Sequence, residues 1–314
     1  MKMKLKNNKK YFTKIKNKET RRNLLKRKRK RKRKCIINEK IIYIIFKLFF
    51  CAASVYVFIQ PKKIQYVNLF IATHKDFPNN VIVNPAYKII CDERSQLKRE
   101  YKLEIIETSK NNILYPKKIG YGENAKIYPI WKLYKEGKMS SKYVGLFQYR
   151  RFFSFKNYIP DLDKIFSDYD VILPKRFKFR ISVRKQYKYY HFIEFLDLSV
   201  DIVKEKFPEY YPYSKSFMKK TKGNFCNVFI MKQSDFIKWG EFVFGVLFEF
   251  DKMLNLTSDY DIELLIRNEK RKTHSHYNVE YNLRLQGFLI ERLGNIFYDK
   301  HFSRRYEMKI VDIK

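Results

Sequence analysis

The sequence predicts an α/β domain whose C-terminal part is mainly helical. Between residues 66 and 231, short apolar runs rich in β-branched and aromatic side chains alternate with helical patterns, and the later patterns are mostly helical. Hydrophobic residues occupy 45% of the 314 positions, enough for a substantial core, and nine glycines and nine prolines are too few for a fibrous or disordered chain. We expect residues 61–302 to form this domain and residues 303–314 to form a C-terminal tail.

The N-terminal segment is strongly basic. Residues 1–34 hold 19 Lys/Arg and one acid, Glu19, and so contribute +18 of the chain's net charge of +36. Because such a charge run repels itself, residues 1–40 are predicted to be a disordered tail. The tail can bind anionic lipid head groups, at roughly 1 kcal/mol per basic residue near the surface. It can also bind nucleic acid without sequence preference, or serve as a nuclear address.

Residues 41–60 are predicted to cross a membrane, which favours the lipid role for the tail. The 19 residues from Ile41 to Ile59 are interrupted only by Lys47 and Ser54. At about 1.5 Å per residue this helix would span about 28 Å, close to a bilayer core. The basic tail before it predicts a single-pass signal anchor with a cytoplasmic N-terminus. A helix in the membrane interface, or one packed on the domain, is the alternative.

The elements of the domain follow from its apolar patterning. Strands are expected at residues 66–72, 87–91, 143–147, 170–173 and 226–231. Helices are expected at residues 125–136, 161–166 and 192–206, from Pro208 onward, at 234–254 with Ser234 as the N-cap, and at 280–298. Residues 76–124 show no other regular pattern, and residues 120–124 are expected to form a turn.

Polar side chains follow two of the expected strands. Thr73, His74 and Lys75 come after the first, and the segment YVGLFQYRRFF at 143–153 ends its strand with Gln148, Tyr149, Arg150 and Arg151. Ligands of open α/β sheets bind at the carboxyl ends of strands, and a guanidinium fork suits a diphosphate or carboxylate. The pattern therefore predicts a pocket for an anionic small molecule. The alternative is an edge strand with both arginines in solvent or paired with acids.

The metal-binding signals are weak. The three D-x-D pairs are Asp161/Asp163, Asp168/Asp170 and Asp259/Asp261, and none follows an expected strand. Asp259 and Asp261 are the better candidates for Mn²⁺ or Mg²⁺. Without a metal, the two arginines and Lys75 would have to neutralise a bound diphosphate. The four cysteines show no zinc-site spacing, and a Cys91–Cys226 disulfide is expected only in an oxidising compartment.

Two of the five histidines are pocket candidates, His74 and His191, whereas His274 and His276 fall in a basic loop. No G-x-S-x-G elbow occurs, which disfavours a hydrolase with a serine nucleophile. Arg284 and Glu291 lie seven residues apart on one face of the last expected helix. They can form an ion pair that locks this helix, or Glu291 can act as a base or orient one of the arginines.

Six segments, in order, resemble the family known as domain of unknown function 4422 (DUF4422), found among capsular-polysaccharide glycosyltransferases with a GT-A-like fold. These segments are FIATHK at 70–75, GLFQYRRFF at 145–153, DVILPK at 170–175, QY at 186–187 with His191, NVFIMK at 227–232 and RLQGFLIERLGNIFY at 284–298. The resemblance covers residues 66–302. It implies a GT-A-like nucleotide-sugar-binding domain for this part of the chain.

The resemblance also implies site residues. The donor would be bound by Thr73, His74, Lys75, Gln148, Tyr149, Arg150 and Arg151. His191 and Glu291 would be catalytic, and Gln186, Tyr187, Asn227, Arg284 and Arg292 would complete the pocket. Gln148 departs from the family's H-Y-R-R pattern, because glutamine can hydrogen-bond but cannot titrate.

These observations predict a hexosyltransferase-like enzyme that moves a sugar from a nucleotide-sugar donor to a glycan acceptor. The alternative is a catalytically weak transferase fold that acts as a basic membrane-surface or nucleic-acid-binding module. The +18 tail and Gln148 motivate that second hypothesis.

Overall fold

The structure is a computed structural model that describes residues 65–78, 82–273 and 277–313. The predicted basic tail and membrane segment (residues 1–40 and 41–60) lie outside these ranges, as do His274 and His276. Within the described ranges, no helix has the length and hydropathy that membrane crossing requires.

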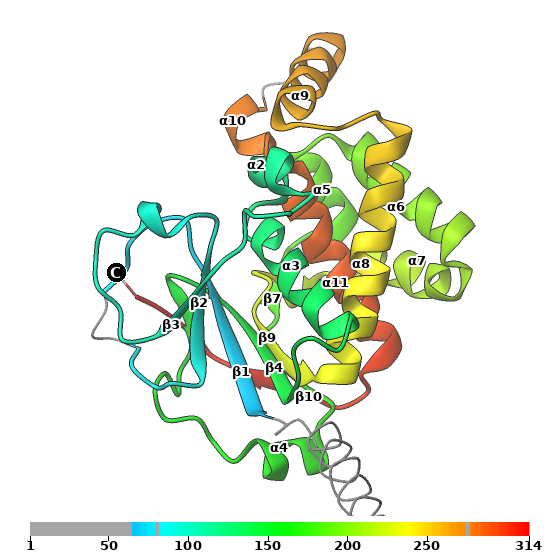
Figure 1. The fold of residues 1–314 in the computed structure, drawn as a ribbon. Coiled ribbons are helices and arrows are strands. Elements are labelled where there is room, and N and C mark those ends of the chain that lie inside the picture. The colour runs from blue at the N-terminus through cyan, green and yellow to red at the C-terminus, as the bar shows by residue number, and fades with distance from the viewer. Residues whose placement is uncertain (1–64, 79–81, 274–276, 314) are drawn as a thin grey trace, which may run out of the picture. The chain divides into compact units, whose positions relative to one another are not determined.

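A mixed nine-stranded sheet forms the centre of the domain, with a separate two-stranded antiparallel sheet (Figure 1). The main path runs β10-β6-β9-β4-β1-β2-β3, while β5 pairs with β4 and β11, and β7 pairs with β8. The strands are β1 (Gln65–Ala72), β2 (Tyr87–Cys91), β3 (Glu104–Glu107), β4 (Ser141–Gln148), β5 (Arg151–Phe153), β6 (Val171–Pro174), β7 (Phe177–Lys178), β8 (Lys222–Gly223), β9 (Phe229–Lys232), β10 (Arg305–Met308) and β11 (Ile310–Asp312).

Four neighbouring strands, β4, β1, β2 and β3, run parallel to one another, so their carboxyl ends share one edge of the sheet. The parallel strands are nearly continuous apolar runs because both of their faces are covered. Gly145 of β4 stands opposite Leu69 of β1, and a Cβ at Gly145 would lie 2.4 Å from the Leu69 side chain. Close packing at this point therefore requires glycine.

Helices pack beside the sheet, and α8 contacts both α3 and α11 (Figure 1). The described α-helices are α2 (Lys118–Tyr121), α3 (Asn124–Lys135), α4 (Leu162–Asp168), α5 (Val183–Tyr190), α6 (Ile193–Lys206), α7 (Tyr211–Lys219), α8 (Gln233–Met253), α9 (Asp259–Thr273), α10 (Val279–Asn282) and α11 (Leu285–His301). Short 3₁₀ helices are η1 (Arg94–Gln96), η2 (Tyr115–Lys117) and η3 (Pro208–Tyr210).

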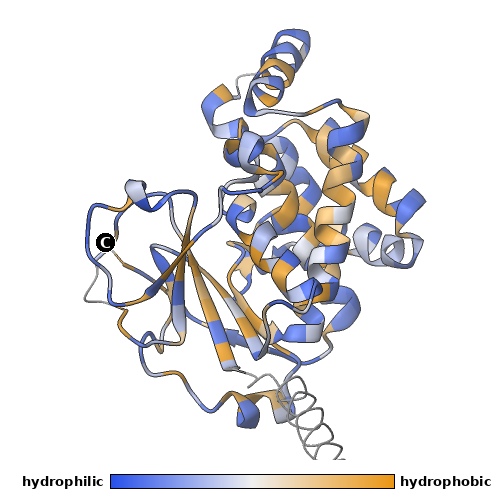
Figure 2. Cartoon of the chain, in the orientation of Figure 1, coloured by the Kyte–Doolittle hydropathy of each residue, from blue (hydrophilic) through white to orange (hydrophobic). Residues whose placement is uncertain are grey.

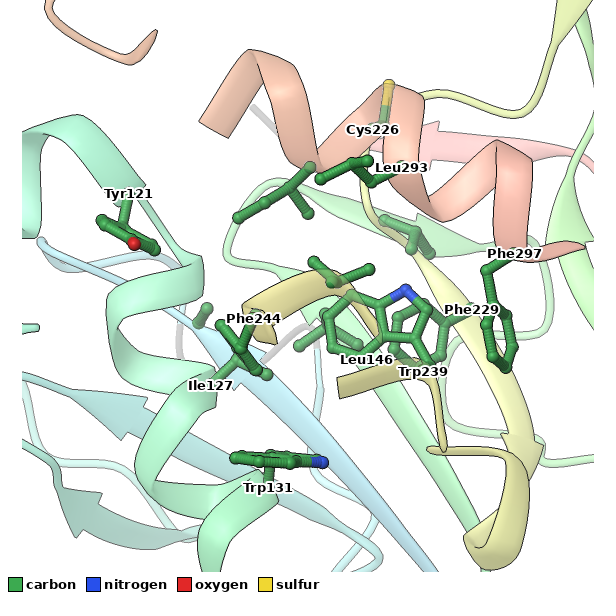
Figure 3. Close-up of a cluster of buried hydrophobic side chains, with 14 of the residues drawn as sticks. Tyr121, Ile127, Trp131, Leu146, Cys226, Phe229, Trp239, Phe244, Leu293 and Phe297 are labelled. Atoms are coloured by element: carbon green, nitrogen blue, oxygen red, sulfur yellow. The ribbon is translucent and has the colours of Figure 1, made fainter. Parts of the chain in front are cut away.

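The hydrophobic core fills the space between the sheet and these helices (Figure 3). Trp239 of α8 packs 5.3 Å from Phe229 of β9, and Phe244 of α8 packs 5.4 Å from Trp131 of α3, measured between ring centroids. Figure 2 shows hydrophobic residues along the central strands and α8. Burying each such side chain contributes roughly 1.5–3 kcal/mol, so this core fixes the helices against the sheet.

A buried polar network joins α8 to three other helical segments. Asp251 of α8 pairs with Lys117, and it accepts hydrogen bonds from the Tyr121 hydroxyl (2.7 Å) and the Gln286 amide (2.9 Å). These partners belong to η2, α2 and α11. Because every member is buried, the network positions α2 and the start of α11 relative to α8.

The structure confirms the mixed α/β fold with a helical C-terminal part, and it corrects several element predictions. Residues 305–312 form β10 and β11 within the main sheet rather than a tail, so the domain continues beyond residue 302. Strand β3 was not predicted, because its four residues, EIIE, show no alternation of apolar and polar side chains that would mark a strand. The long helix α8 has Lys232 rather than Ser234 at its N-cap, since Lys232 is the last extended residue.

The last predicted helix is two helices, α10 and α11, with a break at Leu283 and Arg284. This break redirects Arg284, whose guanidinium pairs with Glu123 at 3.2 Å. The predicted Arg284–Glu291 ion pair is therefore wrong, and Glu291 pairs with its neighbour Arg292. Helical spacing failed here because the two residues do not share one continuous helix.

Candidate active site

A pocket of about 800 Å³ opens where β1, β2 and β4 end and where α2, α5 and α11 converge. Eleven of the predicted site residues line it: Thr73, His74, Gln148, Tyr149, Arg150, Arg151, Gln186, His191, Arg284, Glu291 and Arg292. Lys75, Tyr187, Asn227, Asp259 and Asp261 do not line it. We call the part built at the strand ends the strand side, and the part built by α5, α10 and α11 the helix side.

The strand side begins with the turn after β1. The Thr73 hydroxyl donates to the Lys75 carbonyl and accepts from the Lys75 backbone N–H, so this turn is locally closed. The His74 ring meets Tyr149 edge-on at 5.1 Å, and the Lys75 ammonium lies 5.4 Å from the centre of the same ring. Partial burial, with the nearby charges of Lys126 and Lys75, lowers the pKa of His74.

The two adjacent arginines differ in their environment. Arg150 is exposed at the pocket, and no carboxylate in the described part of the chain forms an ion pair with it. Arg151 donates to the Gln148 side-chain oxygen at 3.0 Å and lies 3.6 Å from the Asp312 carboxylate. Arg150 is therefore the freer of the two for an incoming anion.

Gln148 connects three segments at the end of β4. Its amide nitrogen donates to the Glu123 carboxylate and to the Cys226 carbonyl at 2.9 Å, and its oxygen accepts from Arg151. The side chain is buried, and these three partners all line the pocket. The glutamine thus orients a carboxylate and a guanidinium at the same time.

Sequence reasoning missed several polar residues of the pocket, among them Asp92, Gln96, Glu123 and Lys126. Asp92 follows β2, is 3% exposed, and pairs through one carboxylate oxygen with Lys126 at 2.8 Å. Its other oxygen is buried without a hydrogen-bond donor, as is the side-chain oxygen of Gln96. The strand-end rule that selected Thr73 could have found Asp92, whereas nothing local marked Glu123.

Glu291 of α11 brings a second carboxylate to the pocket. It accepts from the Cys226 backbone N–H at 3.2 Å and from the Arg292 guanidinium at 3.0 Å. Burial raises the pKa of Glu291, and the nearby Glu123 charge raises it further, against the opposing effect of Arg292. A carboxyl whose pKa moves toward neutrality is better matched to proton transfer.

The turn before β9 holds these groups together. Cys226 and Asn227 both have positive φ, +84° and +46°, although neither is glycine. The Cys226 N–H binds Glu291 while its carbonyl binds Gln148, so one residue links the two sides of the pocket. Left-handed backbone at a non-glycine residue costs on the order of 1–3 kcal/mol, and such strain gathers at functional sites.

Arg292 is a buried cation on the helix side. Its guanidinium carbon lies 5.1 Å from the ring centres of both Tyr187 and Phe225, and it donates to the Gln186 side-chain oxygen at 2.9 Å. The Glu291 carboxylate supplies its counter-charge. Tyr187 therefore supports the pocket from behind instead of lining it.

His191 is held as a neutral imidazole. The Asn282 amide nitrogen donates to two carbonyls, those of Asn278 (2.9 Å) and Tyr190, so its oxygen accepts from His191 Nδ1 at 2.9 Å. This network assigns the proton to Nδ1 and leaves a lone pair on Nε2. Burial lowers the pKa of His191 to about 4, with a further contribution from Arg292.

The family described as "Domain of unknown function (DUF4422)" matches residues 68–264. The chain belongs to this family. The match spans β1 to α9, which include the whole strand side of the pocket and the α5 part of the helix side.

The fold of this DUF4422 chain is similar to that of a solved glycosyltransferase, the apo structure of the bifunctional WbbM, with a TM-score of 0.59 and 20% identity. The alignment covers 80% of the present chain and 46% of that one, so the chain spans less than half of the solved structure. No curated protein matches the sequence. The likeness establishes a glycosyltransferase-like fold.

None of the three D-x-D pairs of this DUF4422 chain fits a metal site. Asp161 caps α4, Asp170 pairs with Arg304, and Asp259 accepts from the backbone N–H groups of Ile119 and Gly120. Asp261 is held by Thr257 and Ser258. Across the described residues, no group of three His, Cys, Asp or Glu side chains could hold an ion. Cys91 and Cys226 are free thiols.

Proposed function

We propose that this DUF4422 chain is a glycosyltransferase that moves a sugar from a nucleotide-sugar donor to a glycan acceptor. The observation that carries the proposal is one pocket in which cations and unpaired acceptor atoms at the strand ends face a carboxylate of raised pKa on α11. The donor would occupy the strand side, and the acceptor hydroxyl would approach from the helix side.

The strand side suits a nucleoside diphosphate. The buried oxygens of Asp92 and Gln96 lack donors, and an unpaired buried polar atom costs roughly 1–3 kcal/mol. Ring N–H groups or ribose hydroxyls of a nucleoside would supply those donors. Six cations line the pocket against three carboxylates, which favours a bound diphosphate. We assign diphosphate binding to Arg150 and Arg151, and donor positioning to His74, with Lys75 acting from outside the pocket through the Tyr149 ring.

The helix side supplies groups for the transfer. The acceptor hydroxyl oxygen would attack the anomeric carbon, the bond to phosphate would break, and the nucleoside diphosphate would leave with the bonding electrons. The hydroxyl proton would pass to the Glu291 carboxylate, whose raised pKa suits a base. Neutral His191 would accept a hydrogen bond at Nε2 and so orient the acceptor.

Calorimetric titration with a panel of nucleotide sugars tests the diphosphate assignment. The Arg150→Ala variant should bind the preferred donor about tenfold to a hundredfold more weakly, as expected for losing a charge-assisted hydrogen bond. Arg271→Ala is the matched control, because Arg271 is an exposed arginine of α9 outside the pocket. Equal donor affinity in Arg150→Ala and Arg271→Ala would contradict the assignment.

A further inference from the structure

A second hollow, an open groove of about 700 Å³, lies among α5, α6, α7 and the segment that precedes α5. Its charged lining consists of Arg180, Arg184, Lys185, Asp197, Lys215 and Lys219. Val200 and Met218 contribute apolar surface. We call this hollow the basic groove.

Most of the positive charge in the basic groove is uncompensated. Arg184 forms a two-pronged pair with Asp197, at 3.1 and 2.5 Å. The other four cations are exposed, and none has a carboxylate within ion-pair distance in the described part of the chain. Like charges around one concave surface repel one another, and a bound polyanion would relieve that repulsion.

The basic groove adjoins the candidate active site through a shared wall. Phe177, Phe179 and Gln186 line the pocket, while Arg180 and Lys185 line the groove. Phe179 and Arg180 are consecutive, as are Lys185 and Gln186, so the two hollows are one residue apart at both positions. The two hollows are therefore close neighbours on either side of this wall, and a chain molecule bound in the pocket would enter the groove by passing over the wall.

We propose that the basic groove binds an acidic stretch of the acceptor glycan, one that carries carboxylate or phosphate groups. This inference rests on the proposed function, because it names the chemical class of the acceptor for the same site. The position of the groove beside the candidate active site favours a glycan that extends from the acceptor end, rather than a lipid surface. Its lining includes no aromatic side chain on which nucleic-acid bases would stack, which disfavours a single-stranded nucleic acid.

Hydrogen exchange of the full-length protein tests the inference at the level of individual segments. The probes are an octamer of galacturonic acid, a neutral maltooctaose, an eight-nucleotide oligothymidylate and phosphatidylglycerol vesicles. The acidic octamer should protect peptides covering residues 180–187 and 213–221, and maltooctaose should not. Because protection is read by segment, binding elsewhere on this basic chain does not enter the result.

Charge removal provides the matched variants. Arg180→Gln/Lys185→Gln/Lys219→Gln should abolish groove protection and weaken octamer binding at that site about tenfold, the sum of three exposed ion pairs. Lys102→Gln/Lys110→Gln/Lys164→Gln removes the same charge from exposed lysines outside the groove and should behave like the wild type. Both triple variants should retain the thermal unfolding midpoint of the wild type.

Three results would overturn the inference: protection unchanged in the groove variant, equal protection by maltooctaose, or groove protection by vesicles or oligothymidylate in place of the acidic octamer. A separate titration with nucleotide sugar keeps the two proposals apart. Donor binding with no groove protection would defeat the acidic acceptor alone. Absence of donor binding would defeat the proposed function, whatever the groove binds.

Discussion

The two sides of the pocket are built in different ways. On the strand side, candidate site residues follow directly after β1, β2 and β4, and several, such as His74 and Arg150, are exposed. On the helix side, His191 and Arg292 are buried, and their partners come from segments distant in sequence. The strand side is therefore accessible to a ligand, whereas the side chains of the helix side are fixed by contacts within the protein.

The contrast in burial predicts a large difference in stability between two arginine variants. Arg292→Ala should lower the free energy of unfolding by about 3–5 kcal/mol, because it removes a buried guanidinium with its hydrogen bonds and leaves the partly buried Glu291 carboxylate without its counter-charge. Arg150→Ala should change it by less than about 0.5 kcal/mol, since that side chain is exposed. Urea unfolding measures both. If Arg292→Ala lost no more free energy of unfolding than Arg150→Ala, the proposed difference in burial between the two sides would be contradicted.

The two candidate histidines predict a difference in pH dependence. The folded pKa of His191 is about 4, below its ordinary value of 6.5, so the unfolded chain binds the proton more readily. Stability should therefore fall as the pH drops from 6.5 to 4, by about 3 kcal/mol from this group. His191→Gln should lose that component. His74→Gln should lose a smaller component. The pKa of His74 is also lowered, but its side chain is exposed, and solvent screens the interactions that lower it.

Urea unfolding of the wild type and both histidine variants at several values between pH 4 and 7 separates these contributions. Carboxylate titration is common to all three proteins, so the differences between the curves isolate each histidine. If His191→Gln followed the wild-type curve, the imidazole would not be held neutral by burial.

Gln148 is where the strand side depends on tertiary contacts in the same way as the helix side. Gln148→Leu removes one hydrogen bond each from Glu123, Arg151 and the Cys226 carbonyl, and should lower the free energy of unfolding by about 1–3 kcal/mol. Donor affinity should fall as well, because Arg151 loses its orientation. Gln148→His, which restores the family pattern, should retain donor binding. Unchanged stability in Gln148→Leu would show that these hydrogen bonds contribute little.

Local patterns predicted the strand side better than the helix side. Thr73, His74 and Arg150 were identified because each follows a short apolar run that is typical of a buried strand. Asp92 obeys the same rule after β2 and was still overlooked. Gln186 and Arg292 were selected through the family resemblance, since nothing in their local sequence marks a pocket. His191 was already a pocket candidate among the histidines, and the resemblance gave it a catalytic role.

The sequence by itself determined the alternation of strands and helices, because apolar periodicity is a local property of the chain. It also determined which polar residues stand at strand ends. The tertiary structure alone decided the break between α10 and α11, the pairing of Arg284 with Glu123, and the link from Cys226 to both Gln148 and Glu291. Those features depend on packing between segments far apart in the chain, and no short-range pattern encodes such contacts.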